Sequence, residues 1–135
     1  MSTNGTETLL NHSIGGVFVI VNQMPRAVKW YRDIMGLPED DEFMSTATPD
    51  MQTIYSIPLG STNLILDSIH RETLKPSPNH LFMFDTENID ETYKTMKKKN
   101  VDVISSIEGS GSVRFFEVYD SEGNKIMFCE EKQRK

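Results

Sequence analysis

Residues 17–37, VFVIVNQMPRAVKWYRDIMGL, carry the clearest signals of secondary structure in this sequence. The first five of these residues, 17–21, are all β-branched or aromatic and too few for a helix, which predicts a strand with both faces covered. Pro25 suits a first helical turn, and apolar side chains then recur three and four residues apart, at Ala27, Trp30, Tyr31 and Ile34. Gly36 suits a left-handed cap, so an amphipathic helix is expected to end there.

The second half of the chain repeats this order. Residues 80–84 predict a strand, and residues 89–99 predict a helix that Asn88 caps and Asn100 ends. The two helix ends, Gly36 and Asn100, lie 64 residues apart, and the same offset carries Ile20 onto Phe84 and Gly16 onto His80. Between and after these elements lie short β-rich runs, at 51–58, 63–66 and near Val101, Val113 and Ile126. The sequence therefore predicts an α+β fold of two tandem βαβββ modules.

The length of 135 residues fits one domain. We expect residues 14–131 to form it, with module one at about 14–68 and module two at about 80–131. The Pro-containing segment at about 69–79 is expected to link the two modules. Residues 1–13 are expected to be disordered or loosely attached, and residues 132–135 to form a tail.

Composition excludes several classes of function. Fourteen Lys and Arg against 20 Asp and Glu give a net charge of −6, which lacks the positive field that nucleic acid binding requires. Cys129 is the single cysteine, which excludes an intrachain disulfide and a cysteine-rich zinc module. The polar N-terminal segment does not resemble a signal peptide, and the apolar run at 17–21 is far too short for a membrane span. We expect a cytoplasmic protein that binds neither nucleic acid nor membrane.

Four segments of the chain resemble the vicinal oxygen chelate superfamily, which contains glyoxalases, bleomycin resistance proteins and extradiol dioxygenases. They are residues 17–21, the helix from Arg26 through Trp30-Tyr31 to Gly36-Leu37, Asn88-Ile89-Asp90-Glu91, and Asp120-Ser121-Glu122-Gly123-Asn124. The resemblance implies eight strands that curl into an open cup, a site on the concave face and a homodimer.

In members with a catalytic metal, the resemblance implies ligands from the first and last strands of each module. Those positions fall on Gly16, His80, Met127 and either Leu66 or Asp67, since the alignment leaves that position open by one residue. Gly16 has no side chain, and the thioether of Met127 suits soft metals rather than Mn²⁺ or Fe²⁺. His80 and Asp67 remain as weak metal candidates, and we expect no metal or other cofactor.

Six side chains are candidates for lining a ligand pocket in the cup: Tyr55, His80, Phe82, Arg114, Phe116 and Met127. His80 shares strand parity with Phe82 and Phe84, which allows it to point into the cup beside these rings. The alternative, which the sequence leaves open, is a histidine exposed at the strand entry after the Pro-rich segment. Alternation sends Arg114 and Phe116 to one face and Glu117 to the other. Either Arg114 or Glu117 could therefore provide a polar anchor, and the sequence leaves this choice open.

Three functions fit these observations. The first is a protein of the glyoxalase and bleomycin resistance type that binds a small, partly apolar organic molecule in its cup, without the usual intact divalent-metal site. The second is a metal-dependent lyase of lactoylglutathione-lyase type, or a dioxygenase, that holds Zn, Ni, Mn or Fe through His80 and a non-standard ligand set. The third is an interaction module with a filled cup. The run Gly109-Ser110-Gly111-Ser112 predicts a hairpin turn rather than a phosphate loop.

Overall fold

The computed structural model describes residues 8–132, so the outermost parts of the expected N-terminal segment and tail, residues 1–7 and 133–135, lie outside it. Its elements are β1 (Val17–Ile20), α1 (Met24–Ile34), α2 (Asp41–Thr46), β2 (Ile54–Leu59), β3 (Thr62–Asp67), a 3₁₀ turn (Arg71–Thr73), β4 (Met83–Asp85), α3 (Ile89–Lys98), β5 (Asp102–Val103), β6 (Glu108–Ser110), β7 (Val113–Tyr119) and β8 (Lys125–Glu131). Within residues 8–132, no helix is long and apolar enough to cross a membrane.

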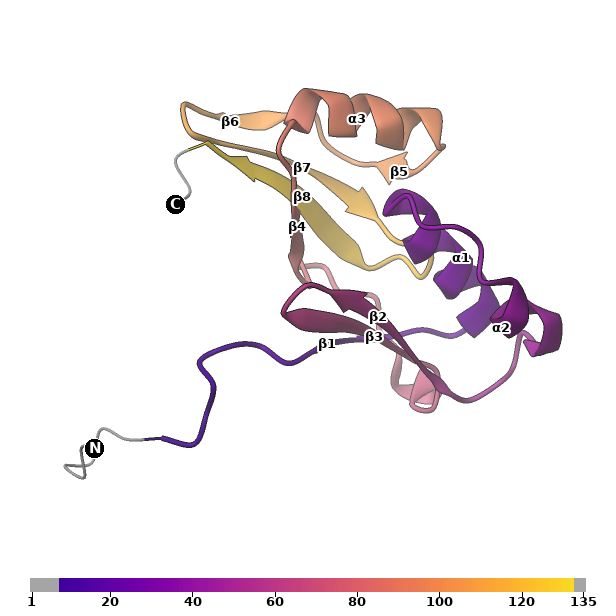
Figure 1. The fold of residues 1–135 in the computed structure, drawn as a ribbon. Coiled ribbons are helices and arrows are strands. Elements are labelled where there is room, and N and C mark those ends of the chain that lie inside the picture. The colour runs from indigo at the N-terminus through magenta and orange to yellow at the C-terminus, as the bar shows by residue number, and fades with distance from the viewer. Residues whose placement is uncertain (1–7, 133–135) are drawn as a thin grey trace.

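The strands form two open sheets, and Figure 1 shows the β1–β3 sheet on one side of the molecule and the sheet under α3 on the other. The first sheet has the order β1-β3-β2, with β1 parallel to β3 and β2 antiparallel to it. The second has the order β4-β8-β7-β5, and β6 pairs with β7. The predicted α+β fold with eight strands is confirmed, although the strands divide into three and five rather than four and four.

The first module has a short helix between α1 and β2, where the expected βαβββ order has no second helix. Residues 41–46 form the short helix α2, whose N-cap Asp40 accepts a hydrogen bond from the Phe43 backbone N–H at 3.1 Å. Asp41 and Glu42 follow in the first turn, where negative charge favours a helix. The sequence pattern does not predict this helix, because six residues are too few to show a helical period.

The two longer helices begin and end where the sequence predicts. Pro25 lies in the first turn of α1, and the Asn88 side chain caps α3 by accepting from the Glu91 backbone N–H at 3.1 Å. Gly36 and Asn100 follow the two helices with φ of 71° and 61°. Both residues therefore adopt the left-handed conformation expected after a helix end.

Each sheet has a face covered by helices and a face that points away from them, which we call the open face. In β3, Leu64 and Leu66 lie in the core, whereas Ile65 and Asp67 point to the open face. In the second sheet, Phe116 and Phe128 stack below α3 with ring centroids 5.2 Å apart. Glu117 and Met127, one residue along each strand, therefore lie on the open face.

The assignment of residues to the two faces corrects the offset between the two modules that the sequence predicted. Ile20 lies on the open face, but Phe84 packs in the core against Phe128, with ring centroids 5.5 Å apart, so the two are not equivalent. Val19 is the core residue that corresponds to Phe84, an offset of 65 residues. The first buried residues of the helices, Met24 and Ile89, share this offset. The helix ends are 64 apart because α3 has 10 residues and α1 has 11.

Two of the sequence motifs that carry the family resemblance bind each other across the molecule. The Tyr31 hydroxyl of α1 donates to Asp120 Oδ2 at 2.5 Å, in the turn between β7 and β8. Asp120 Oδ1 accepts from the backbone N–H groups of Glu122 and Asn124, at 2.8 and 2.9 Å. Asn124 Oδ1 in turn accepts from the Ser77 backbone N–H of the linker at 3.1 Å. This buried network ties the first module to the second, a link that sequence spacing does not reveal.

Tyr31→Phe is expected to lower the free energy of unfolding by about 1.5–3 kcal/mol, because a hydrogen bond to a buried carboxylate is lost. Burial and the adjacent Asp120 raise the pKa of Tyr31 well above its usual value of 10.0. As the pH rises past about 10, tyrosine ionises first in the unfolded chain, so this contribution to stability is present below that pH and lost above it. In urea unfolding, the difference in free energy of unfolding between wild type and Tyr31→Phe should be smaller above pH 10 than near pH 8. An equal difference at the two pH values would contradict this prediction.

Gly109 is required by the β6–β7 hairpin. Its φ is +92°, and a Cβ there would lie 2.4 Å from the Val113 carbonyl oxygen and 3.2 Å from Arg114 Cα. Both neighbours are backbone atoms of the paired strand β7, so they cannot rotate away. The predicted hairpin is thus confirmed, with Gly111 and Ser112 as its turn.

Gly109→Ala is therefore expected to open this hairpin at a cost of about 1–3 kcal/mol. Amide hydrogen exchange should accelerate in β6 and at the start of β7, measured against wild type. Gly15→Ala is the matched control, because its Cβ would meet nothing within 4 Å. Equal exchange in the two variants would refute the requirement.

Candidate ligand-binding face

A row of side chains in register crosses the open face of the second sheet. Met83 of β4 pairs with Met127 of β8, and Met127 pairs with Glu117 of β7. The next row along the strands holds Phe115 of β7 opposite Cys129 of β8. The face therefore sets carboxylates among apolar and sulfur-containing side chains: Glu117 in the first row, and Asp85, which pairs with Cys129, in the next.

His80 completes this arrangement. Its Nε2 lies against Glu117 Oε2, and the two side chains are 39% and 21% exposed. His80 lies outside β4, where the backbone is irregular, so strand alternation does not decide the direction of its ring. The following residue fixes the segment to β8, since the Leu81 N–H donates to the Lys125 carbonyl at 3.0 Å. Within residues 8–132, Nδ1 of the ring makes no hydrogen bond, so Glu117 orients an imidazole whose second nitrogen can meet a ligand.

The open register at the end of β3 is resolved by the structure. Leu66 is in the core, and Asp67 lies on the open face of the first sheet, beside Ile20 and Ile54 on the neighbouring strands. Asp67 Oδ2 lies 2.8 Å from His70 Nδ1, and Oδ1 accepts from the His70 backbone N–H at 3.1 Å. Burial alone would raise the pKa of Asp67, but the hydrogen bonds from His70 outweigh it and lower that pKa.

The residues at the family's metal-ligand positions do not fit a catalytic divalent ion. Gly16 offers no donor, and a Cβ built there would lie 2.6 Å from Cδ1 of Ile65, whose side chain fills the space. Met127 offers only a thioether, and His80 is already paired with Glu117. Within residues 8–132, no three His, Cys, Asp or Glu side chains come together in a way that could hold a metal. A catalytic site needs about three protein ligands, so this donor set is incomplete.

Two of the six pocket candidates, His80 and Met127, belong to this face, but two others lie in the helix-covered core. Phe116 is 0% exposed and packs edge-on against Tyr93 of α3, with centroids 5.0 Å apart. Phe82 is half-buried and packs edge-on against Phe84 at 5.2 Å. The prediction that Phe82 and Phe84 face the cup beside His80 is therefore wrong, because the chain becomes regular only after His80.

Arg114 also lies on the helix side. Its Nη1 and Nη2 donate to the two carboxylate oxygens of Asp90 on α3, at 3.0 and 3.1 Å. The guanidinium therefore clamps the start of α3 to β7, and this pairing lowers the pKa of Asp90. Of Arg114 and Glu117, it is therefore Glu117 that lies on the open face. Sequence alternation correctly separated the two residues but could not assign the faces.

Tyr55 lies away from the open face, beside α1 and α2. Its hydroxyl donates to Asp40 Oδ2 at 2.5 Å and accepts from Arg32 Nη1 at 3.4 Å. The hydrogen bond from Tyr55, together with that from the Phe43 backbone, lowers the pKa of Asp40. Arg32 also donates to the Pro38 carbonyl at 2.8 Å. This network fixes the segment between the two helices.

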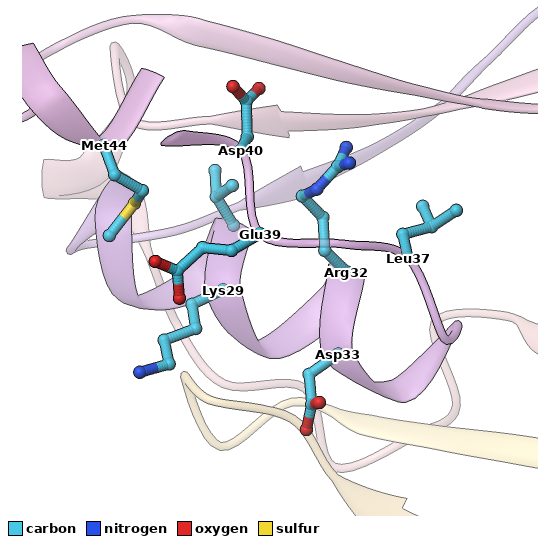
Figure 2. Close-up of a pocket in the computed structure, with 8 residues that line it drawn as sticks. Lys29, Arg32, Asp33, Leu37, Glu39, Asp40 and Met44 are labelled. Carbon is cyan, nitrogen blue, oxygen red and sulfur yellow. The ribbon is translucent and has the colours of Figure 1, made fainter. Parts of the chain in front are cut away.

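Arg32 and Asp40 also line a small pocket between α1 and that segment. Figure 2 shows charged side chains of both signs around it, including Lys29, Asp33 and Glu39. Its volume is about 80 Å³. Ligand pockets are usually about 300–1,000 Å³, so this one is too small for more than a few water molecules.

Solved structures share the fold at low sequence identity. A glyoxalase family protein from Bacillus anthracis is 21% identical, with a TM-score of 0.67 over 93% of this chain and 100% of its own. A lactoylglutathione lyase from Agrobacterium tumefaciens is 16% identical, with a TM-score of 0.64 over 90% and 95%. A glyoxalase/dioxygenase from Nostoc punctiforme is 16% identical, with a TM-score of 0.66 over 96% and 99%. These likenesses show the fold.

No curated protein matches the sequence. The model of one protein family matches residues 12–128, which span both sheets and all three α-helices. That match agrees with the two open sheets and with the Tyr31–Asp120 contact between the motifs of the two modules. The chain belongs to the Glyoxalase/Bleomycin resistance protein/Dioxygenase superfamily.

Proposed function

We propose that this superfamily member binds a small, partly apolar organic molecule on the open face of its second sheet, without the usual divalent-metal site. The observation that carries the proposal is the Met83–Met127–Glu117 row with His80 paired to Glu117. Ligand sites are mostly apolar, with a few polar groups that fix orientation. This face combines both features.

Each side chain has a role in the proposed binding. The methionine thioethers are flexible and polarisable, so they adapt to apolar parts of different shapes. Glu117 fixes the imidazole of His80, and Nδ1 of that ring hydrogen-bonds a polar group of the ligand. A metal-dependent lyase or dioxygenase would require further ligands that Gly16 and Met127 do not supply.

The test uses p-cresol as an apolar probe with one hydroxyl, titrated into protein carrying ¹³C-methyl methionine. The methyl signals of Met83 and Met127 should shift, whereas those of Met35 and Met96 on the helix side should not. His80→Ala should weaken binding about fivefold, the effect of one lost hydrogen bond. His12→Ala is the matched control, since His12 is exposed and lies outside both sheets. Unmoved Met83 and Met127 signals at the solubility limit of p-cresol would overturn the proposal.

We also propose that two copies of the chain pair through the open face of the first sheet, which leaves the second sheet free for the ligand. Phe18 and Ile54, two large apolar side chains, are 63% and 43% exposed there. Exposed apolar side chains grouped on one face are typical of an interaction surface. Sedimentation equilibrium should give the mass of a dimer, and Phe18→Glu should shift it toward the monomer. A wild-type monomer at high concentration would exclude this pairing.

A further inference from the structure

A second hollow lies on the side of the molecule opposite the open faces, between the end of α1, the β2–β3 turn and α3. Its volume is about 540 Å³, within the usual range for ligand pockets of about 300–1,000 Å³. Its floor is apolar and comes from both modules: Met35, Leu59, Phe84, Met96 and Phe128. We call it the interhelical cleft.

The internal repeat explains why the cleft exists. In the other half of the molecule, the β7–β8 turn spans residues 120–124, and its Asp120 reaches the Tyr31 hydroxyl of α1. The corresponding β2–β3 turn has only two residues, Gly60 and Ser61, so it does not extend as far. At the 65-residue offset, Met96 of α3 stands where α1 has Tyr31, and it has no hydroxyl to bridge the gap. A hydrogen-bonded network therefore closes the junction of α1 with the β7–β8 turn, whereas the junction of α3 with the β2–β3 turn stays open.

The rim of the cleft carries one sign of charge. Glu87 and Glu91 line it, and its neutral polar lining residues are Thr86, Asn88, Thr92 and Thr95. Asp85 also borders the cleft, but strand alternation directs its side chain to the open face with Met83. The cleft is lined by no Lys, Arg or His of residues 8–132. Glu91 lies 3.4 Å from Lys94, but both side chains are mostly exposed, at 66% and 74%, so this pair is weak and easily exchanged. An apolar floor below the carboxylates of Glu87 and Glu91 is complementary to an organic cation.

We propose that the interhelical cleft binds a small amphiphilic amine, with its apolar part on the methionine and phenylalanine floor and its ammonium group at the carboxylate rim. Charge-assisted hydrogen bonds from the ammonium to Glu87 and Glu91 orient the molecule. The apolar part gains by leaving water, so affinity rises with the length of the alkyl chain. This site is separate from the open face, because Phe84 and Phe128 of its floor belong to the helix-covered core.

The experiment titrates full-length protein carrying ¹³C-methyl methionine with n-hexylamine, 1-hexanol and hexanoate at neutral pH. Hexylamine should shift the signals of Met35 and Met96 and leave Met83 and Met127 unmoved. Hexanol should bind about tenfold more weakly, and hexanoate more weakly still, because each lacks the cation. Equal binding of all three probes, or shifts confined to Met83 and Met127, would overturn the proposal.

Two variants make the test specific to the cleft. Glu91→Gln should weaken hexylamine binding about fivefold, whereas Glu108→Gln, a matched change on the exposed strand β6, should not. Thr95→Trp should fill the cleft and abolish the shift at Met96; its position is exposed on α3, so the fold tolerates it. Unchanged affinity in both Glu91→Gln and Thr95→Trp would contradict the assignment. The p-cresol titration of the open face reads different methionines, so either proposal can fail alone.

Discussion

Asp120→Ala is expected to lower the free energy of unfolding by about 3–5 kcal/mol, because it leaves several buried donors without an acceptor. Asp120 is 6% exposed and accepts from the Tyr31 hydroxyl, from Asn124 Nδ2 at 3.3 Å and from the backbone N–H groups of Glu122 and Asn124. Its carboxylate thus holds both the β7–β8 turn and the contact with α1. Chemical denaturation at neutral pH measures the loss.

Two further variants separate this network from a general effect of removing an acidic residue. Asp102→Ala, at an exposed position of β5, should change stability by less than about 0.5 kcal/mol. The loss of stability in Asp120→Asn should lie between those of Asp120→Ala and Asp102→Ala, since asparagine keeps one acceptor oxygen. If Asp120→Ala unfolds at the same denaturant concentration as Asp102→Ala, the turn does not join the two modules as described.

Phe116→Ala is expected to cost about 3–5 kcal/mol, the usual range for a fully buried phenylalanine. The ring is 0% exposed and lies between Phe128, stacked at 5.2 Å, and Tyr93 of α3, edge-on at 5.0 Å. Its removal leaves a cavity between β7 and α3 that rigid neighbours cannot fill. The thermal and denaturant midpoints should both fall.

The sequence also allowed Phe116 to line the ligand pocket, and this variant distinguishes that role from core packing. Ile69→Ala is the control, because Ile69 is 48% exposed outside both sheets and its removal should cost less than about 1 kcal/mol. A Phe116→Ala protein with wild-type stability but no affinity for p-cresol would place the ring in the pocket and contradict the structure.

The elements and the family could be predicted because their signals are local. Pro25 and Gly36 mark the ends of α1 by backbone geometry alone, and Asn88 and Asn100 do the same for α3. The run Asp120 to Asn124 indicated a turn of the family type, and the structure confirms it. The α1 motif and the run Asp120 to Asn124 did not predict the contact between Tyr31 and Asp120, because that contact depends on the packing of one module against the other.

The sequence did not correctly predict which face of its sheet each strand side chain occupies. A shift of one residue moves every side chain of a strand to the other face, and the repeat offset is 65 rather than 64. That single step moved Phe82 into the core and left Met83 on the open face. His80 reaches Glu117 because it precedes the regular part of β4, and no periodicity describes such a residue.

The open face, as proposed, binds its ligand without a divalent metal held by His80. This is tested by calorimetric titration of chelator-treated protein with Mn²⁺, Fe²⁺, Ni²⁺ and Zn²⁺, in parallel with His80→Ala. We expect only weak heats that are the same for wild type and variant, because Gly16 and Met127 supply no hard ligand. Uptake of one ion per chain that is lost in His80→Ala would contradict the account and identify a metal-dependent site.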